Sequence, residues 1–445
     1  MIFKNREQLI NNGQTSEIKH KREDVLEILN AAVHAVDPYI SVKNRIKESK
    51  IVCEDKTIDP TCFDTIYLIG FGKASAGMAQ AICDNITIHS GVVITNDSKA
   101  IINHKNIEVI IGSHPLPDNK SIQGAEKALE IALKCTERDL LIVLISGGGS
   151  AVLCKPRVNL VDLQDTTDLL LRSGATINEI NTIRKHLSHV KGGQLVKYTK
   201  ATVVSLVISD IVYDPLEFIA SGPTYPDSTT FTDAFQILRR YHIWKKIPHS
   251  VQNVIKNGIK GEITETPKPD DQLFEKVNHC IIANNLLACI AAENQAKKLG
   301  YQTMLLTTSL TGEAREIGRY LIDKATSYQS LKNDWVFISG GETTVTVKGS
   351  GSGGRNQEMV LGVVEKIAES GIVFASLGTD GIDGGSDAAG AIADGFTFQR
   401  GKNKNLDPDE FLKNNNSYMF FKPLGDLFLT GPTGTNVMDI QILVV

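Results

Sequence analysis

The sequence predicts an α/β protein of two domains, the first a Rossmann-like parallel sheet flanked by helices. The chain has 445 residues, more than one ordinary hydrophobic core requires. Short β-branched runs alternate with segments suited to helices, a pattern typical of βαβ units. The charged, Pro- and Gly-rich stretch KNGIKGEITETPKPDDQ, near residue 256, separates two such series. We therefore expect domains over residues 1–262 and 263–445.

The individual elements follow from apolar periodicity. Residues 23–36 repeat apolar side chains at helical spacing and stop at Asp37-Pro38, so a helix opens the fold. ATINEINTIRKHLSHVKGGQL is predicted to be a helix with a capping box at Thr176 and Glu179, ending at Gly192-Gly193. The strands expected before residue 256 are TIYLIG, GVVITN, IEVIIG, LLIVLISGGGS and ATVVSLVISD. Those expected after it are VNHCIIANN, YQTMLLTT, DWVFISGGETTVTV, GIVFASLGTDG and QILVV, with helices through LLACIAAENQAKKLG and NQEMVLGVVEKIAE.

Composition excludes several classes of protein. A formal net charge of −4 gives no broad basic field, so nucleic acid is not an expected partner. The seven cysteines are odd in number and lack a C-x-x-C pair, which favours reduced thiols over disulfides or zinc. The first residues lack a signal-peptide core and no apolar run is long enough to span a membrane. We expect a cytoplasmic protein and leave a homodimer open.

The stretch YLIGFGKASAGMAQAI resembles a dinucleotide-binding turn but departs from it. Ser75 stands where the third glycine belongs, and Lys73 lies where a helix N-terminus already gathers positive potential. A lysine there suits an anionic ligand, because it otherwise works against the helix dipole. From this stretch alone, an anion site and a tight turn with a solvated lysine are equal alternatives.

The stretch ISGGGSAVL follows the most apolar of the expected strands. Its three glycines, Gly147, Gly148 and Gly149, expose N–H groups without side-chain obstruction and permit the backbone of an anion nest. Ser146 and Ser150 add hydroxyls on either side. No Walker A motif occurs, so the nest does not belong to a P-loop protein.

Cations and histidines follow in the helix predicted after residue 176. Arg184 and Lys191, seven positions apart, are expected on one face of it, with Lys185 adjacent. They suit an anion, but cations near a helix C-terminus are also ordinary dipole partners. His186 and His189 have no evident third metal ligand, and we expect them to be packed or solvated.

Carboxylates gather after later strands. Asp210 lies at a strand end with Asp214 four residues on, a place suited to Mg²⁺ beside a nucleotide. Asp380, Asp383 and Asp387 crowd within eight residues, which is unfavourable unless a cation offsets them. Two further candidates, Glu342 after a glycine pair and Arg355 in a glycine-rich loop before a helix, end the series.

Nine segments of the chain, taken in order, resemble the type II glycerate kinases, the glycerate 2-kinase family. They are GFGKASAGMA, GSHPLPDNKS, LISGGGSA, INTIRKHLSHVKGG, VISDIVYDPLEFIASGPT, GGETTVTV, GGRNQE, GTDGIDGGSDAAGA and GPTGTNVMD. The resemblance implies an N-terminal Rossmann-like domain, a C-terminal MOFRL domain and an active site in the cleft between them. It also implies ATP-dependent phosphorylation of D-glycerate at its 2-hydroxyl, giving 2-phosphoglycerate with Mg²⁺.

The resemblance assigns the catalytic roles to Lys73 and Arg355. One departure is visible, because the family usually has Gly where Tyr213 stands. For Mg²⁺ the candidates are Asp210 and Asp380, whose roles we do not separate. The expected substrate- and nucleotide-binding residues are Ser75, Ser146, Gly147, Gly148, Gly149, Ser150, Lys185, Lys191, Glu342 and Asp383.

Two rival functions remain at this point. An NAD(P)H-dependent hydroxypyruvate reductase would explain the near-miss dinucleotide turn, but the glycine pattern is broken and no histidine base paired with a carboxylate is evident. A non-catalytic module that binds sugar acids or nucleotides would need fewer ionisable residues than these strand ends carry. The kinase hypothesis accounts for most of the motifs.

Overall fold

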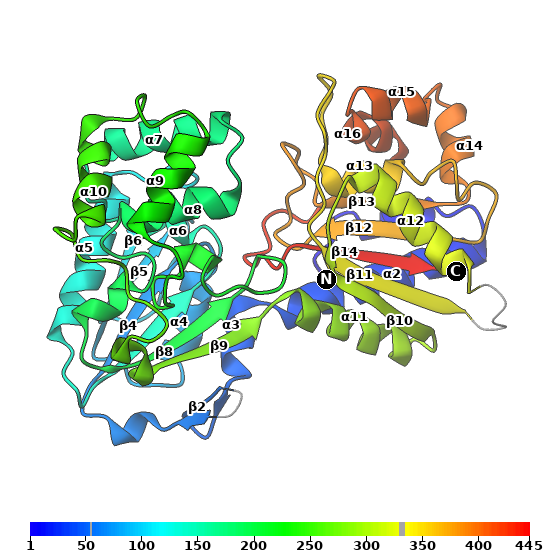
Figure 1. The fold of residues 1–445 in the computed structure, drawn as a ribbon. Coiled ribbons are helices and arrows are strands. Elements are labelled where there is room, and N and C mark those ends of the chain that lie inside the picture. Colours follow the sequence, from blue (N-terminus) through cyan, green and yellow to red (C-terminus); the bar gives the residue numbers. More distant parts are fainter. Residues whose placement is uncertain (54–55, 329–333) are drawn as a thin grey trace. The chain divides into compact units, whose positions relative to one another are not determined.

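The computed structural model describes residues 1–53, 56–328 and 334–445, which form two compact units (Figure 1). The central unit comprises residues Pro38–Ser209 and Asp214–Ile282. The C-terminal unit comprises Met1–Asp37, Asp210–Tyr213 and Ala283–Val445. Each unit has its own sheet covered by helices, so the predicted α/β class is confirmed. None of the helices described is both long and apolar enough to cross a membrane.

The central unit is built on a six-stranded sheet of order β6-β5-β4-β7-β8-β9, in which β6, β5, β4, β7 and β8 pair in parallel. The strands are β4 (Ile66–Phe71), β5 (Ser90–Thr95), β6 (Ile107–Ile111), β7 (Leu140–Ile145), β8 (Thr202–Ile208) and β9 (Val277–Ala283). A small antiparallel sheet joins β1 (Ile46–Lys47), β2 (Lys50–Cys53) and β3 (Lys56–Ile58). The helices are α3 (Pro38–Lys43), α4 (Ser75–Cys83), α5 (Asn119–Lys134), α6 (Gly149–Val152), α7 (Leu160–Arg172), α8 (Ile177–His186), α9 (Phe231–Arg240) and α10 (His249–Ile259).

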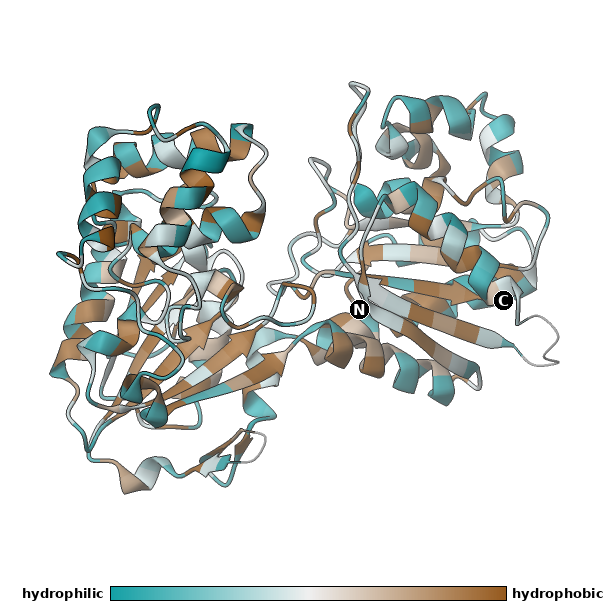
Figure 2. Cartoon of the chain, viewed as in Figure 1, coloured by the Kyte–Doolittle hydropathy of each residue, from teal (hydrophilic) through white to brown (hydrophobic). Residues whose placement is uncertain are grey.

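Burial explains why these short apolar runs become strands. All six residues of β7, LLIVLI, are buried, as expected for a central parallel strand covered on both faces. The strands of both large sheets are mainly hydrophobic (Figure 2). Helices α7 to α10 enclose a second apolar cluster that includes Leu170, Ile183 and Leu238. The parallel pairing places the turns after β4, β5, β6 and β7 at one edge of the sheet, which is where open α/β sheets bind ligands.

The C-terminal unit contains a mixed five-stranded sheet of order β10-β11-β14-β12-β13. β10 and β11 are parallel, whereas β14 runs antiparallel to both β11 and β12. The strands are β10 (Gln302–Leu310), β11 (Trp335–Gly341), β12 (Val373–Gly378), β13 (Gly390–Asp394) and β14 (Asp439–Val444). The helices are α1 (Arg6–Asn11), α2 (Ser16–Ala35), α11 (Asn285–Lys298), α12 (Ala314–Thr326), α13 (Arg355–Leu361), α14 (Thr397–Lys402), α15 (Pro408–Lys413) and α16 (Ser417–Phe421).

Several boundaries differ from those expected. Residues 1–37 pack with the C-terminal half of the chain, where α2 lies beside α11 (Figure 1). The expected linker near residue 256 lies inside the central unit, because α10 continues to Ile259 and the residues after it return to α8. Strand β11 ends at Gly341 and α13 at Leu361, both earlier than predicted.

A buried arginine holds α2 to the C-terminal unit. Arg22 has no exposed surface, and its Nε donates to Asp394 Oδ2 at 2.5 Å. Its Nη1 donates to Asp426 Oδ1 at 2.9 Å, and Arg400 donates to the other oxygen of Asp426. Both aspartates are also fully buried. The ion pairs that attach α2 therefore join residues separated by nearly the whole length of the chain.

Replacement of Arg22 by Met is expected to destabilise the C-terminal unit by about 3–5 kcal/mol, because it leaves buried carboxylate charge uncompensated. The measurement is urea unfolding followed by the fluorescence of Trp335, the tryptophan of this unit, in a Trp244→Phe background. Arg138→Met, which removes an exposed ion pair to Asp64, is the control and should cost about 0–1 kcal/mol. Equal losses in both variants would contradict the buried network.

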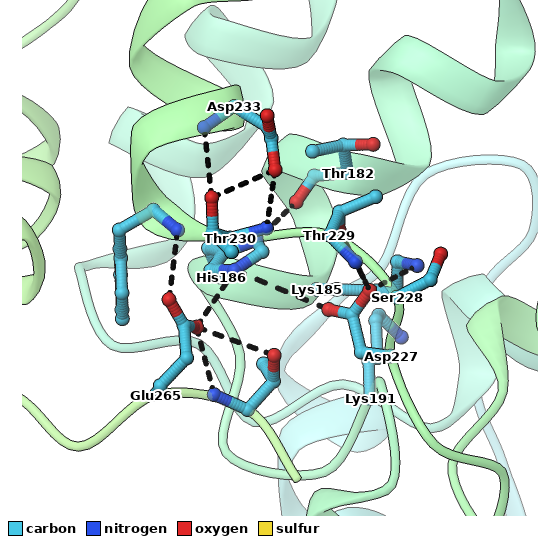
Figure 3. Close-up of polar contacts among 12 residues, drawn as sticks. Thr182, Lys185, His186, Lys191, Asp227, Ser228, Thr229, Thr230, Asp233 and Glu265 are labelled. Atoms are coloured by element: carbon cyan, nitrogen blue, oxygen red, sulfur yellow. Dashed lines mark hydrogen bonds and ion pairs between the residues drawn. The ribbon is translucent and has the colours of Figure 1, made fainter. Parts of the chain in front are cut away.

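A second buried network fixes the end of α8 in the central unit (Figure 3). Lys185 Nζ donates to Asp227 Oδ1 at 2.6 Å and to Glu217 Oε1 at 2.7 Å. The buried His186 lies between two acceptors, with Nδ1 2.7 Å from the Thr182 carbonyl and Nε2 2.9 Å from Glu265 Oε1. His186 is packed, one of the two outcomes expected for it.

Glu265 is expected to make this unit sensitive to acid. Burial raises its pKa, but hydrogen bonds from His186 and from the Phe231 N–H lower it to about 2, against an ordinary 4.5. The stabilisation is therefore complete above pH 4.5 and is lost as the pH falls toward 2. In urea unfolding followed by Trp244 fluorescence, the stability difference between wild type and Glu265→Gln should shrink across that window. The exposed control Glu262→Gln should leave the stability close to that of wild type.

Candidate functional site

The turns after β4 and β7 are locked together at the ligand-binding edge of the central sheet. Gly72 has a φ of +113°, and a Cβ there would lie 2.4 Å from the Ser146 carbonyl oxygen, so only glycine fits. Ser146 Oγ accepts from the Ala74 N–H at 3.1 Å, and the Lys73 N–H donates to the Gly147 carbonyl at 2.9 Å. The two glycine-containing motifs of the sequence therefore form one structure.

The glycine loop presents free backbone donors. Gly148 adopts a left-handed φ of +79°, which turns the chain into the short helix α6. The N–H groups of Gly147 and Gly148 donate to no acceptor in the described part of the unit. Consecutive N–H groups without an acceptor, at the carboxyl end of a parallel strand, are suited to bind phosphate or carboxylate oxygens.

Lys73 and His114 lie against this loop. A side chain at Gly148 would come within 3.3 Å of Lys73 Cγ and 3.2 Å of His114 Cδ2. Lys73 is half-buried and forms no ion pair or side-chain hydrogen bond among the residues described for its unit. Partial burial and the charges of Lys73 and Arg184 lower the pKa of His114, so its ring is neutral at pH 7. The arrangement offers a cation and amides to an anion, beside a neutral imidazole.

Three of the expected ligand-binding residues have side chains engaged in contacts within the fold. Ser75 is fully buried and its hydroxyl donates to the Gly72 carbonyl at 2.7 Å. Lys191 is buried, and its Nζ donates to the carbonyls of Ser150 and Leu153 at 2.7 and 2.8 Å. Burial lowers the pKa of Lys191 to about 8, and the charge of Arg184 adds to this effect. Lys185 is neutralised by its two carboxylates, so all three side chains are occupied by the fold.

Helix α8 also ends earlier than predicted, which separates Lys191 from Arg184. The helix stops at His186, and Lys191 lies beyond it in an irregular segment. The expectation that Arg184 and Lys191 share one helical face was therefore wrong. The capping box of Thr176 and Glu179 is confirmed.

In the C-terminal unit, Arg355 joins three strand ends. Its Nε and Nη2 donate to the two oxygens of Asp439 at 2.5 and 2.9 Å, and its Nη1 lies 3.1 Å from Glu342 Oε1. Asp439 begins β14 opposite Gly341 and Gly378, the last residues of β11 and β12. Burial lowers the pKa of Arg355, but the bond and charge of Asp439 more than reverse this and raise it. This is a fixed, half-buried cation with further N–H groups to offer.

Asp383 and Asp380 lie close to this arginine but differ in role. Asp383 is buried and accepts from the N–H groups of Asn356 and Gln357 at 3.0 and 2.8 Å, which fixes the first turn of α13. Burial raises the pKa of Asp383 to about 6 despite these bonds. Asp380 is half-buried, and its Oδ1 accepts from the Ile382 N–H at 3.1 Å. Asp383 thus serves the backbone, whereas Oδ2 of Asp380 accepts no hydrogen bond from the residues described in its unit.

The residues described do not form a ready-made metal cage. No group of three or more histidine, cysteine, aspartate or glutamate side chains among residues 1–53, 56–328 and 334–445 is arranged to hold an ion. Asp210, a candidate ligand, lies two residues beyond the end of β8 and is half-buried. A single carboxylate fits a Mg²⁺ that keeps its waters and is held mainly by nucleotide phosphates.

Tyr213 occupies a backbone position that favours glycine. Its φ is +68°, and its side chain is 83% exposed, so little packing offsets the strain. This explains physically why glycine suits the position in the motif that Tyr213 interrupts.

We expect Tyr213→Gly to be as stable as wild type or more stable by up to about 1 kcal/mol. The reason is that the relief of backbone strain outweighs the added conformational freedom of the unfolded chain. Tyr213→Ile should instead lose about 1 kcal/mol or more, because a branched side chain is disfavoured at positive φ. Thermal unfolding of both variants measures this. A more stable Ile variant would contradict the assignment of strain.

Sequence reasoning missed two candidate residues, one in each unit. His114 lies in the quoted segment GSHPLPDNKS, three residues after β6, and its position at a parallel strand end was the available signal. Asp439 ends the quoted segment GPTGTNVMD, but its pairing with Arg355 spans 84 positions, and no local pattern indicates it.

Comparison with known proteins gives the family. A model described as a domain of unknown function, DUF4147, matches residues 24–256, and the MOFRL family model matches residues 335–439. A glycerate 2-kinase of Pyrococcus horikoshii is 44% identical, with 95% of this chain and 97% of the relative covered. A putative hydroxypyruvate reductase of Agrobacterium vitis is 38% identical, over 95% of this chain and 94% of the relative.

A solved structure agrees with the sequence relatives. The crystal structure of a glycerate kinase from Thermotoga maritima superposes with a TM-score of 0.86 at 38% identity, covering 96% of this chain and all of that one. Its fold and the two family models account for both units described above. The chain therefore belongs to the type II glycerate kinase family.

Proposed function

We infer that the protein is a glycerate kinase that transfers the γ-phosphoryl group of ATP to the 2-hydroxyl of D-glycerate, giving 2-phosphoglycerate and ADP. The names of the relatives support the kinase activity and ATP as co-substrate. The observation that carries the proposal is the uncompensated cation Lys73 beside the free amides of the glycine loop. Such a site offers positive charge that can stabilise an anion. Phosphoryl transfer depends on this stabilisation more than on covalent chemistry.

Lys73 and Arg355 have different surroundings and therefore different proposed roles. Lys73 has a flexible stem and no counter-ion among the residues described in its unit, so it can follow the phosphoryl group as its charge redistributes. Arg355 is held by Asp439 in a fixed direction, which suits it to orient a ligand oxygen through its remaining N–H groups. His114, neutral at pH 7, is placed to accept the proton of the attacking hydroxyl.

Mg²⁺ is proposed to enter with ATP. When bound, it would neutralise part of the negative charge of the nucleotide phosphates. Asp380, with Asp210 as the alternative, would supply the single carboxylate that such an ion takes from a protein. The chain's own contribution to the phosphates is the pair of Gly147 and Gly148 amides together with Lys73.

Direct quantification of ADP tests the activity. The purified protein with ATP and Mg²⁺ should form ADP rapidly with D-glycerate, far more slowly with L-glycerate, and negligibly without an acceptor. In a separate mixture, NADH with hydroxypyruvate should remain unoxidised. Oxidation of NADH without formation of ADP from glycerate would replace the kinase by the reductase.

A further inference from the structure

Two polar side chains of α8 stand beside the glycine loop and have no role in the function derived so far. Asn181 and Arg184 are three positions apart, so they project from neighbouring places on one side of the helix. The network of Lys185 and His186 fixes the end of the same helix (Figure 3). A helix anchored so firmly can hold two side chains at a defined position.

Arg184 is a desolvated cation without a counter-ion among the described residues of its unit. It is half-buried, and burial lowers its pKa. It makes no ion pair and no side-chain hydrogen bond to the residues described in its unit. Its charge instead adds to the fall in the pKa of two basic groups, His114 and Lys191, and opposes the rise in the pKa of the Cys154 thiol. Arg157, comparably buried, differs because its Nη2 donates to Gln194.

Such an arrangement is unfavourable in the free protein. A guanidinium withdrawn from water loses hydration that only an acceptor can replace, and neighbouring cations increase the cost. An anionic ligand that bound here would remove the penalty. The favourable ligand has two oxygens in one plane, because the guanidinium fork matches that geometry.

Asn181 supplies a donor oriented in the same region. It is 5% exposed, and its Oδ1 accepts from Ser221 Oγ at 3.3 Å. Ser221 Oγ lies 2.8 Å from Ser150 Oγ, at the end of the glycine loop. Because Oδ1 is engaged, the amide orientation is set, and its Nδ2 donates to no acceptor in the part of the unit that is described. Asn181 therefore directs two N–H groups beside the loop.

We propose that Arg184 and Asn181 form the subsite that binds the carboxylate of glycerate, which rests on the function proposed above. The guanidinium takes both carboxylate oxygens, and the Asn181 amide donates to one of them. The backbone amides of Gly147 and Gly148, with Lys73, are left for the phosphoryl group. This division gives the enzyme a preference for small hydroxy acids over uncharged polyols.

Steady-state kinetics with two acceptors tests the subsite. For Arg184→Met, the KM for D-glycerate should rise by about 100-fold while the KM for ATP stays within about twofold. The reason is that the glycerate carboxylate loses a charge-assisted bidentate contact, whereas ATP loses none. The preference for D-glycerate over its uncharged amide, glyceramide, should fall by a similar factor. Arg184→Lys should lie between, because it keeps the charge and loses the fork. Asn181→Asp should also raise the KM for D-glycerate, because the new carboxylate would repel that of the substrate.

Controls separate the possible failures. Arg172→Met removes an exposed arginine of α7 that pairs with Asp168, and it should leave all constants unchanged. If Arg184→Met does not fold, as judged by its melting curve, the Lys variant still reports the change in acid preference. A rise in the KM for ATP alone, or an unchanged preference for glycerate over glyceramide, would overturn the subsite while the wild-type kinase stood. A wild type inactive on glycerate would overturn the proposed function and the subsite with it.

Discussion

Replacement of Lys73 by Ala is expected to lower kcat by on the order of 10³-fold, while the fold stays intact. The side chain lies against Gly148 and has no counter-ion in the part of its unit that is described, so it is available to the transferring phosphoryl group. Removing a positive charge that stabilises the transferring group typically costs on the order of 10²–10³-fold or more. The same lack of partners means that few native contacts are lost.

The measurement is kcat from ADP formation, together with thermal unfolding of the same preparation. Lys105→Ala, an exposed lysine in the loop before β6, is the matched control and should behave as wild type. Lys73→Arg should recover part of the activity, because the charge remains. Wild-type turnover in Lys73→Ala would remove this residue from the mechanism.

Replacement of Arg355 by Ala is expected to lower kcat by on the order of 10²–10³-fold and also to destabilise the C-terminal unit. The two effects have one origin, since the arginine compensates the buried Asp439 as well as facing a ligand. An uncompensated buried carboxylate costs about 3–5 kcal/mol. Loss of activity in the single variant therefore does not by itself identify a catalytic contact.

A double variant separates the two effects. Arg355→Ala with Asp439→Asn removes both charges, so urea unfolding followed by Trp335 should recover most of the lost stability. Activity should remain low if Arg355 contacts the substrate or nucleotide. Recovery of turnover together with stability would show that Arg355 acts only by supporting the sheet edge.

The strand-end motifs could be predicted from sequence because their signals are local. An apolar run followed by small residues specifies both a buried strand and an open turn, and the structure has such turns at Gly72 and at Gly148. The same logic placed Arg355 at the start of α13. What the local pattern indicated was where backbone amides and a few cations stand.

Distinguishing ligand-facing cations from structural ones needed the structure. Lys73, Lys185 and Lys191 are equivalent in local sequence, each a lysine near glycines or a helix end. Lys185 is satisfied by Asp227, which is 42 positions away, and Lys191 by carbonyls 41 and 38 positions away. Of these three lysines, only Lys73 has a side chain with no partner among the residues described in its unit. Partners so distant in the chain leave no local pattern.

The attachment of the N-terminal helix was beyond sequence reasoning for the same reason. The amphipathic pattern of residues 23–36 predicts a helix, and α2 confirms it. Its place is decided by Arg22, whose carboxylate partners lie 372 and 404 positions further on. The end of α8 was likewise misjudged, because Gly192 and Gly193 look like a helix stop, whereas His186 ends the helix and bonds to Glu265.

The most direct test of the central claim is a ³¹P NMR time course of the purified protein with D-glycerate, ATP and Mg²⁺. The account predicts a new phosphomonoester signal that matches 2-phosphoglycerate and grows in step with ADP. A signal that matches 3-phosphoglycerate would keep the kinase and contradict the assigned hydroxyl. No phosphomonoester at all, with ATP unchanged, would contradict the proposed function.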